Sequence, residues 1–340
     1  MININKKYID INQIKVEVFT IGKDSNGEAN ILLFFIDDTV EYSIVIDCCE
    51  NDINIIKEKI FDKYNITRVD MICWTHPHLD HSKGIMKLLK DYSDKKTKVI
   101  FPSELEIVYK CMNSEARKVY NYVTSITEKS RTDKGIYRNA TQNTELEYIT
   151  YVQTNGINNF DFKIISLSPI PRRVLNMKNN CKHDLGKKCS HNFNEYSIAL
   201  IVEINKCFFL FTGDIENETI EEIEKYTKLD NVLFSKIPHH GSNTSTNLLE
   251  VYDIDTCKSM ICTTTALLKK NKFNILPNNE VLEEYKKIFG NVFCTSSSYI
   301  NKKFTRGNFG IIESEFKIPI NPEMNEVKSK IYLSGDAIQI

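Results

Sequence analysis

Three of the seven histidines in the chain lie close together in the segment THPHLDHSKG at positions 75–84. His76 and His78 are separated by one residue, so on an extended loop their side chains point the same way. Asp80 and His81 follow and can turn toward a second position. Neutral imidazoles suit zinc, manganese or iron, and a nearby carboxylate offsets the charge of such ions. A lone buried histidine usually belongs to the core, but three on one loop with an acid predict a metal site.

The segments around this motif predict that it sits at the end of a β-strand. Short β-rich runs occupy 14–20, 30–37, 42–47 and 69–75, and an amphipathic run occupies 53–64. The motif follows the last β-rich run directly, and the sequence GIMKLLKDY after it predicts a helix. We therefore expect the histidines on a loop at the carboxyl end of a strand, where active sites of layered α/β folds gather.

The second half of the chain repeats this order of strands, acidic loop and helix. Residues 103–129 are expected to be helical and the polar stretch that follows to be a surface loop or lid, so that about 103–145 forms an insertion. Strands are predicted at 146–152, 162–168, 196–204 and 207–214, and a helix at 217–227. We interpret the repeated order as a faint internal duplication, without a repeat at the level of residues. Residues 1–340 are expected to form a single domain.

Composition restricts the partners and the compartment. The chain has 340 residues, of which 41% are hydrophobic, enough for a large core. Its formal net charge of −1 provides no overall field toward nucleic acid or a membrane. The N-terminal MININKKYIDINQ lacks the apolar core of a signal peptide, and no later stretch is long enough to span a bilayer. We expect a cytoplasmic protein whose cysteines, such as Cys73 and Cys207, are buried apolar side chains.

Three further motifs accompany the histidine motif: IVIDCCE with Asp47 before it, and FTGD with Asp214 and IPHHGS at 237–242 after it. With H-x-H-x-D-H they make the chain resemble the metallo-β-lactamase-fold hydrolases over most of its length. The resemblance implies an α/β fold, an αββα sandwich of two mixed β-sheets flanked by helices. It also implies two divalent metal ions, zinc or manganese, bridged by Asp214. The implied metal ligands are His76, His78, Asp80, His81, His191, Asp214, His239 and His240, with Asp80 and His240 as the catalytic residues.

A narrower resemblance points to the soluble hydrolase domain of competence DNA-uptake (ComEC-type) proteins. IGKDSNGEANIL at 21–32 is similar to its glycine-rich opening, Asn194 and Ser197 match its N-x-x-S strand, and 275–298 looks like its closing segment. This branch implies a phosphodiester substrate such as DNA, RNA or a cyclic nucleotide. The chain departs from it at Leu276, where the branch has a histidine, so the last metal position falls to His239 or His240 or stays open. The membrane segments of DNA uptake are also missing, and we expect a free-standing soluble enzyme.

The loop at 181–191 leaves three interpretations open. Cys181, His183, Cys189 and His191 form a C-x-H…C-x-H array that could hold a structural zinc. His191 also precedes a strand where the wider family often has its third histidine, and the strand register favours that role. The third interpretation is a solvated lysine-rich loop.

Other residues are candidates for roles around the metals. Asp47 could orient a ligand histidine through its second ring nitrogen, or cap a turn. Ser242 could contact substrate, or start the next helix. The candidates for supporting or substrate-contacting roles are Asp47, Asn194, Ser197, Ser242 and, as phosphate contacts, Lys302, Lys303 and Arg306.

The sequence thus predicts a metal-dependent phosphodiesterase or nuclease. Two cations bridged by Asp214 would bring the pKa of a shared water near neutrality and hold a phosphate oxygen for in-line attack. A thioester or lactone hydrolase of the same fold is one alternative. A nucleic-acid or partner-binding protein with mainly structural metals is another: Leu276 gives it some weight, but the intact H-x-H-x-D-H and Asp214 argue against it. The sequence does not predict the oligomeric state.

Overall fold

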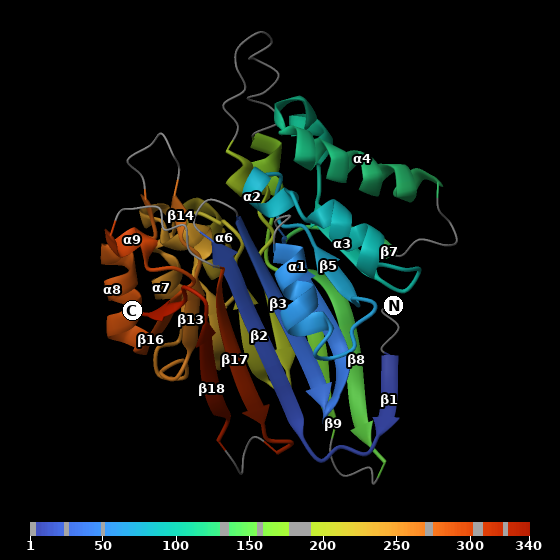
Figure 1. Cartoon of the computed structure of the whole chain (residues 1–340), viewed down its shortest axis with the longest axis vertical. Helices are drawn as coiled ribbons and strands as arrows, with labels where there is room; N and C mark the ends of the chain where they lie inside the picture. Colours follow the sequence, from blue (N-terminus) through green and yellow to red (C-terminus); the bar gives the residue numbers. More distant parts are fainter. Residues whose placement is uncertain are drawn as a thin grey trace.

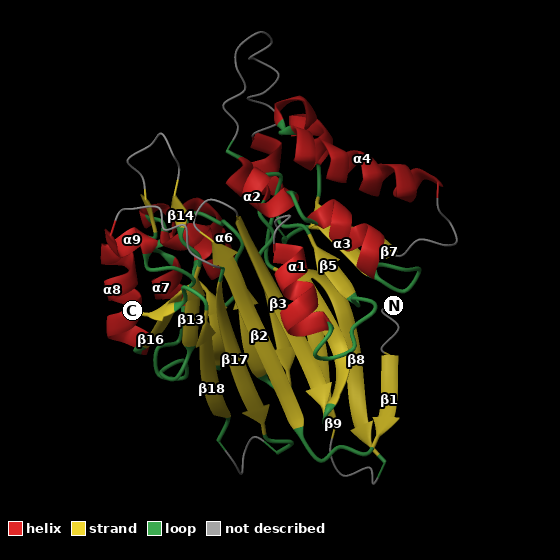
Figure 2. Cartoon of the chain, in the orientation of Figure 1, coloured by secondary structure: helices red, strands yellow, loops and turns green. Residues whose placement is uncertain are grey.

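Two mixed β-sheets lie face to face, with helices packed against the outer side of each (Figures 1 and 2). The computed structural model describes residues 5–23, 27–48, 52–129, 136–154, 159–176, 192–268, 275–301, 309–321 and 326–340. The predicted fold class, an αββα sandwich, is confirmed. Among the helices in these ranges, none is long and apolar enough to cross a membrane.

The first sheet has eight strands in the order β18-β17-β2-β3-β4-β5-β6-β7. Strands β2 (Ile14–Lys23), β3 (Gly27–Ile36) and β4 (Thr39–Ile46) form an antiparallel meander, and β5 (Met71–Cys73) and β6 (Lys98–Pro102) continue it in parallel. Strands β17 (Gly310–Ile318) and β18 (Lys328–Ser334) extend the other side, with β17 antiparallel to β2. The end of the chain therefore completes a sheet that its beginning starts, which the sequence did not predict.

The second sheet has nine strands in the order β1-β8-β9-β10-β11-β12-β13-β16-β19. Their bounds are β1 (Asn5–Ile9), β8 (Thr144–Gln153), β9 (Asn159–Ser166), β10 (Leu200–Ile204), β11 (Cys207–Phe211), β12 (Val232–Lys236), β13 (Ile261–Thr264), β16 (Asn291–Cys294) and β19 (Ile338–Gln339). Here β9, β10 and β11 are antiparallel, and β12 and β13 run parallel to β11. This order repeats the pairing of β2 to β6, as expected for an internal duplication.

The central strand β3 of the first sheet is buried on both faces. In β3, Leu32 and Phe34 face the other sheet, and the ring of Phe34 stacks on Phe162 of β9 with 5.3 Å between centroids. Leu33 and Phe35 face the outer helices. Because successive side chains of a strand alternate between faces, a strand buried on both sides appears in sequence as the continuous apolar run ILLFFI.

The outer helices complete the four layers. The first sheet is covered by α1 (Asp52–Ile56), the π-helical η1 (Lys57–Phe61), α3 (Ile85–Tyr92), η2 (Leu105–Cys111) and α4 (Ser114–Lys129). The second is covered by α6 (Asn217–Glu224), α7 (Leu248–Val251) and α8 (Asn279–Phe289). These positions confirm the helices predicted at 53–64, 103–129 and 217–227, with a break between η2 and α4. The small strands β14 (Leu267–Leu268) and β15 (Ile275–Leu276) pair only with each other.

Two predicted boundaries are wrong. The expected loop after 129 contains β7 (Ile136–Ala140), which pairs in parallel with β6 at the edge of the first sheet. An edge strand needs few apolar side chains, and only Ala140 of β7 is buried, so its sequence carries no alternating pattern. The strand expected from 196 begins at Leu200, because Phe193–Tyr196 form a 3₁₀ turn (η3) capped by Asn192. Cys73 and Cys207 are buried free thiols, as predicted.

Candidate metal centre

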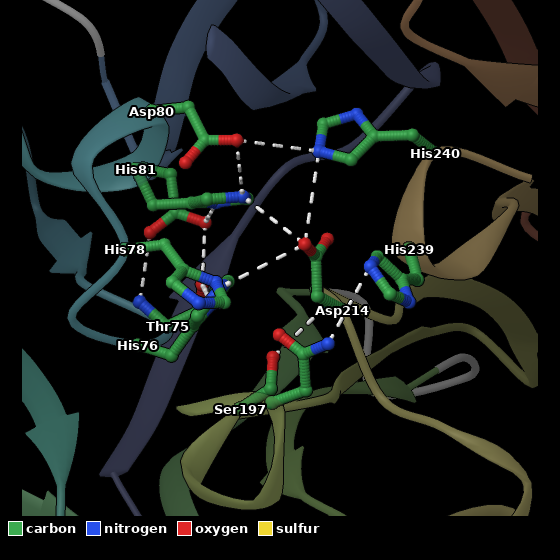
Figure 3. Close-up of polar contacts among 12 residues, drawn as sticks. Thr75, His76, His78, Asp80, His81, Ser197, Asp214, His239 and His240 are labelled. Carbon is green, nitrogen blue, oxygen red and sulfur yellow. Dashed lines mark hydrogen bonds and ion pairs between the residues drawn. The ribbon is translucent and has the colours of Figure 1, made fainter. Parts of the chain in front are cut away.

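Side chains from both halves of the chain meet in one cluster (Figure 3), and α2, which carries two of them, lies at one end of the sandwich (Figure 1). His76 follows β5, and the short helix α2 (Leu79–Ser82) carries Asp80 and His81. From the other half, Asp214 follows β11 and His240 lies in the turn η4 (Pro238–Gly241) after β12. The carboxyl ends of parallel strands in the two sheets thus supply the site.

Asp214 lies at the centre of this arrangement. Its Oδ2 is 3.7 Å from Nε2 of His76, 3.4 Å from Nε2 of His81 and 3.6 Å from Nε2 of His240. The donors form two groups that could each hold a metal ion: His76, His78 and Asp214, and Asp80, His81 and His240. In the second group, Oδ2 of Asp80 is 3.6 Å from Nε2 of His240. Asp214 belongs to the first group, and its Oδ2 also lies close to His81 and His240 of the second.

Asp47 controls which nitrogen of two histidines faces this centre. Its Oδ2 lies 2.7 Å from Nδ1 of His81 and accepts the Thr75 hydroxyl at 2.5 Å. Since the hydroxyl donates its only proton to Asp47, its oxygen accepts from Nδ1 of His76, 2.9 Å away. We assign the proton to Nδ1 in both rings on these contacts. When the rings are neutral, their Nε2 atoms therefore carry the lone pairs, and Nε2 of His76 also lies 2.8 Å from Nδ1 of His78.

The buried polar atoms at the centre fit divalent cations. Among the described residues, Nε2 of His81, Nε2 of His240 and Oδ1 of Asp214 are buried and have no hydrogen-bond partner. Buried polar atoms are rarely left in this state. Imidazole nitrogens and carboxylate oxygens in clusters of three or more are typical ligands of zinc and manganese. The donor set thus suits the metals that the sequence predicts.

Burial and the charges of neighbouring side chains shift the pKa values of His81, Asp214 and His76. Burial lowers the pKa of His81, but the carboxylates of Asp214, Asp47 and Asp80 outweigh it and raise that pKa well above its usual value. Burial raises the pKa of Asp214, yet His240, His81 and His76 hold it well below its usual range. Burial, with the neighbouring rings of His81 and His78, lowers the pKa of His76. The carboxylates therefore favour positive charge at the centre.

His239 belongs to neither donor group. Its Nδ1 lies 3.2 Å from Oε1 of Glu216, and its Nε2 lies 3.4 Å from Nδ2 of Asn194. Burial raises the pKa of Glu216, but hydrogen bonds from His239 and Asn192 lower it to about 2. Of the two adjacent histidines, the geometry brings only His240 to the donor groups.

The remaining predicted residues lie in several places. Ser197 accepts the backbone N–H of Asp214 at 2.9 Å and so holds the loop that carries it. Ser242 accepts the N–H of Thr244 at 3.3 Å and caps the short turn η5 (Asn243–Ser245). Leu276 is half-buried in β15, and a Cβ on Gly241 would lie 2.8 Å from Pro277, so its segment adjoins the turn of His240. The residues outside the described ranges are Cys181, His183, Cys189, His191, Lys302, Lys303 and Arg306.

Sequence reasoning missed four polar residues at the site. Thr75 and Thr265 each contact a donor histidine, and Glu28 and Lys236 form a buried ion pair next to His240 and Asp214. Glu28 and Lys236 could have been identified from the sequence, because Glu28 precedes an apolar strand sequence and Lys236 follows one. The threonines carry no such signal.

The fold and donor set define an αββα sandwich with clustered histidines and aspartates at one end. No family model matches the chain, and no curated protein matches it. Solved structures that resemble it include the metallo-β-lactamase fold protein YhfI from Bacillus subtilis, with 11% identity, a TM-score of 0.40, and coverage of 82% of this chain and 95% of that chain.

Two further solved structures resemble the chain at a similar level of identity. A diphosphatase from the PhnP family is 10% identical with a TM-score of 0.36, covering 74% of this chain and 86% of its own. A long form RNase Z from yeast is 8% identical with a TM-score of 0.47, and the alignment covers 94% of this chain but 49% of that one. Likenesses at this level concern the arrangement of strands and helices and carry no conclusion about activity.

Proposed function

We propose that this protein is a metal-dependent hydrolase of phosphodiesters in nucleic acids or nucleotides. The supporting observation is the convergence of three histidine Nε2 atoms on Oδ2 of Asp214, at 3.4 to 3.7 Å. The choice of phosphodiester rests on the sequence resemblance to the hydrolase domain of ComEC-type proteins.

Each residue group would hold one divalent ion, zinc or manganese. His76, His78 and Asp214 would hold the first, and three protein donors is the number typical of catalytic zinc sites. Asp80, His81 and His240 supply the second, and Asp214 borders both. When bound, such ions lower the pKa of water and offset the charge of a phosphate oxygen.

The protein's own residues would orient these donors and move a proton. Asp47 fixes His81 directly and His76 through Thr75, so the rings cannot turn away. Asp80 retains 20% exposure of its side chain, more than His81 or Asp214, and can exchange protons with solvent. We assign Asp80 the role of accepting the proton of the attacking water.

The test is a substrate panel on protein reconstituted with Mn²⁺ or Zn²⁺. The panel contains bis-p-nitrophenyl phosphate, single- and double-stranded DNA, RNA, cyclic dinucleotides and the thioester S-lactoylglutathione. We expect metal-dependent phosphodiester cleavage, which Asp80→Asn lowers by about 100-fold or more while the protein stays folded. Asp38→Asn, in the turn between β3 and β4 away from the site, is the control. Thioester cleavage alone would favour the alternative hydrolase, and no turnover by metallated protein would favour a binding protein.

A cytoplasmic location stays a prediction. Cys73, Cys207, Cys257 and Cys262 are buried thiols, as in proteins of reducing compartments. Cys111, in η2, is disulfide-bonded. Thiol titration of protein purified under non-reducing conditions tests whether this bond is present in the cell.

A further inference from the structure

A buried ion pair joins the two sheets directly beside the candidate metal centre. Glu28 lies at the start of β3 and Lys236 at the end of β12. Nζ of Lys236 is 2.9 Å from Oε1 of Glu28, and their side chains are 1% and 0% exposed. A buried pair contributes little net stability because both charges lose their hydration. Its place at the polar end of the core suggests a role in the site rather than in the fold.

Lys236 lies beside Asp214. Its Nζ is 3.9 Å from Oδ1 of Asp214 and donates to the backbone oxygen of Gly213 at 3.4 Å. The ammonium group thus lies near one oxygen of Asp214, while the other oxygen, Oδ2, faces His76, His81 and His240. A fixed positive charge at this place holds the carboxylate in the orientation that the two donor groups share.

Glu28 acts on His240 through a threonine. The Thr265 hydroxyl donates to Oε2 of Glu28 at 2.6 Å, and its oxygen lies 2.7 Å from Nδ1 of His240. Because the hydroxyl proton points to the carboxylate, the oxygen can only accept, so Nδ1 of His240 must carry a proton. Its Nε2 then presents a lone pair toward Asp80 and Asp214, 3.6 Å away in each case.

We infer that Glu28, Thr265 and Lys236 form a positioning relay that sets the tautomer of His240 and the orientation of Asp214. It parallels the Asp47–Thr75 contacts to His81 and His76, although here the carboxylate and the threonine come from different halves of the chain. In both sets of contacts a buried carboxylate fixes a threonine hydroxyl, and the hydroxyl oxygen fixes a histidine. This inference rests on the proposed metal-dependent function, because His240 needs its Nε2 lone pair only as a ligand.

The decisive comparison is Thr265→Val with Thr265→Ser. Valine has nearly the same shape but no hydroxyl, whereas serine keeps it. In Thr265→Val we expect the affinity for the second metal equivalent to fall by about 10–100-fold, and Thr265→Ser to retain it. Metal content after dialysis against graded chelator measures the affinity, and the visible spectrum of the Co²⁺-loaded protein reports the ligand geometry.

The ion pair is tested by Lys236→Met. Its matched control is Lys98→Met, because Lys98 of β6 pairs with Glu147 of β8 at 2.5 Å and also joins the two sheets. Lys98 lies at the amino end of its strand, the end opposite to the site. Lys236→Met should change the Co²⁺ spectrum and lower metal affinity, and Lys98→Met should change neither.

Wild-type metal affinity and Co²⁺ spectrum in Thr265→Val would overturn the relay. If the wild-type protein binds two ions but cleaves no phosphodiester, the proposed function fails and the relay stands on the metal data. If the wild type binds no metal, the proposed function fails as well, and the relay is judged in the metal-free protein. There ¹⁵N chemical shifts report the tautomer of neutral His240: loss of the Nδ1–H form in Thr265→Val supports the relay, and an unchanged tautomer overturns it.

Discussion

Nδ1 of His81 lies 2.7 Å from Oδ2 of Asp47, which is 34 positions earlier in the chain. Both side chains are fully buried. Asp47 itself adopts a left-handed backbone conformation, with φ of 56°, directly after β4. This turn places the carboxylate beside the loop that carries the histidine motif at 75–84. There it also accepts the Thr75 backbone N–H at 2.7 Å. A single residue therefore organises the loop backbone and two of its histidines.

Asp47→Asn should weaken metal binding at both donor groups by about 10–100-fold, because an amide cannot accept all the hydrogen bonds that the carboxylate accepts. Metal content at graded chelator measures the loss. Asp70→Asn is the matched control: Asp70 accepts the backbone N–H and the hydroxyl of Ser43, each at 2.9 Å, at the start of β5. Equal metal affinity in the two variants would contradict the role of Asp47.

His240→Ala should lose one metal equivalent, whereas His239→Ala should keep both. The reason is geometric, since Nε2 of His240 lies 3.6 Å from Oδ2 of Asp80 and of Asp214, and His239 contacts Glu216 instead. Elemental analysis of the two purified variants provides the comparison. Loss of metal in His239→Ala alone would reverse the assignment.

Metal removal should lower the thermal stability of the protein. Asp47, Asp80, Asp214 and Glu28 bring four carboxylates close to the centre, and bound cations offset their repulsion. A ligand at 100 times its dissociation constant stabilises the folded state by about 2.7 kcal/mol. Thermal unfolding with chelator and with added Zn²⁺ or Mn²⁺ measures this difference. A melting temperature that chelator leaves unchanged would argue against metal in the centre.

Gly27→Ala should disturb the site as well as the backbone. Gly27 has φ of 100°, and a Cβ there would lie 2.0 Å from the backbone oxygen of Asp80. The added methyl group must displace α2, so we expect weaker metal binding together with lower stability. Gly290→Ala separates the two effects, because Gly290 has φ of 73° with no atom within 4 Å of the new Cβ. It should cost about 1–2 kcal/mol of stability and leave metal binding intact.

The sequence by itself determined the features of this protein that depend on residues close together in the chain. The alternation of His76 and His78 after an apolar strand placed the donors on a loop at a strand end. The period of apolar residues located most strands between 14 and 214 and the helices beside them. These features follow from local geometry, in which side chains repeat every two residues in a strand and about every 3.6 in a helix.

Tertiary structure alone decided the contacts between distant segments. His239 and His240 are adjacent and chemically identical, and only the left-handed turn that they form, with φ of 48° and 54°, sends their rings in different directions. Thr265 meets Glu28 across 237 positions of sequence. Such pairs depend on how two sheets pack, and strand periodicity specifies which face a residue occupies but not which residue of the other sheet it meets. The histidine motif is therefore visible in the sequence, whereas the side chains that orient it emerge only when the sandwich closes.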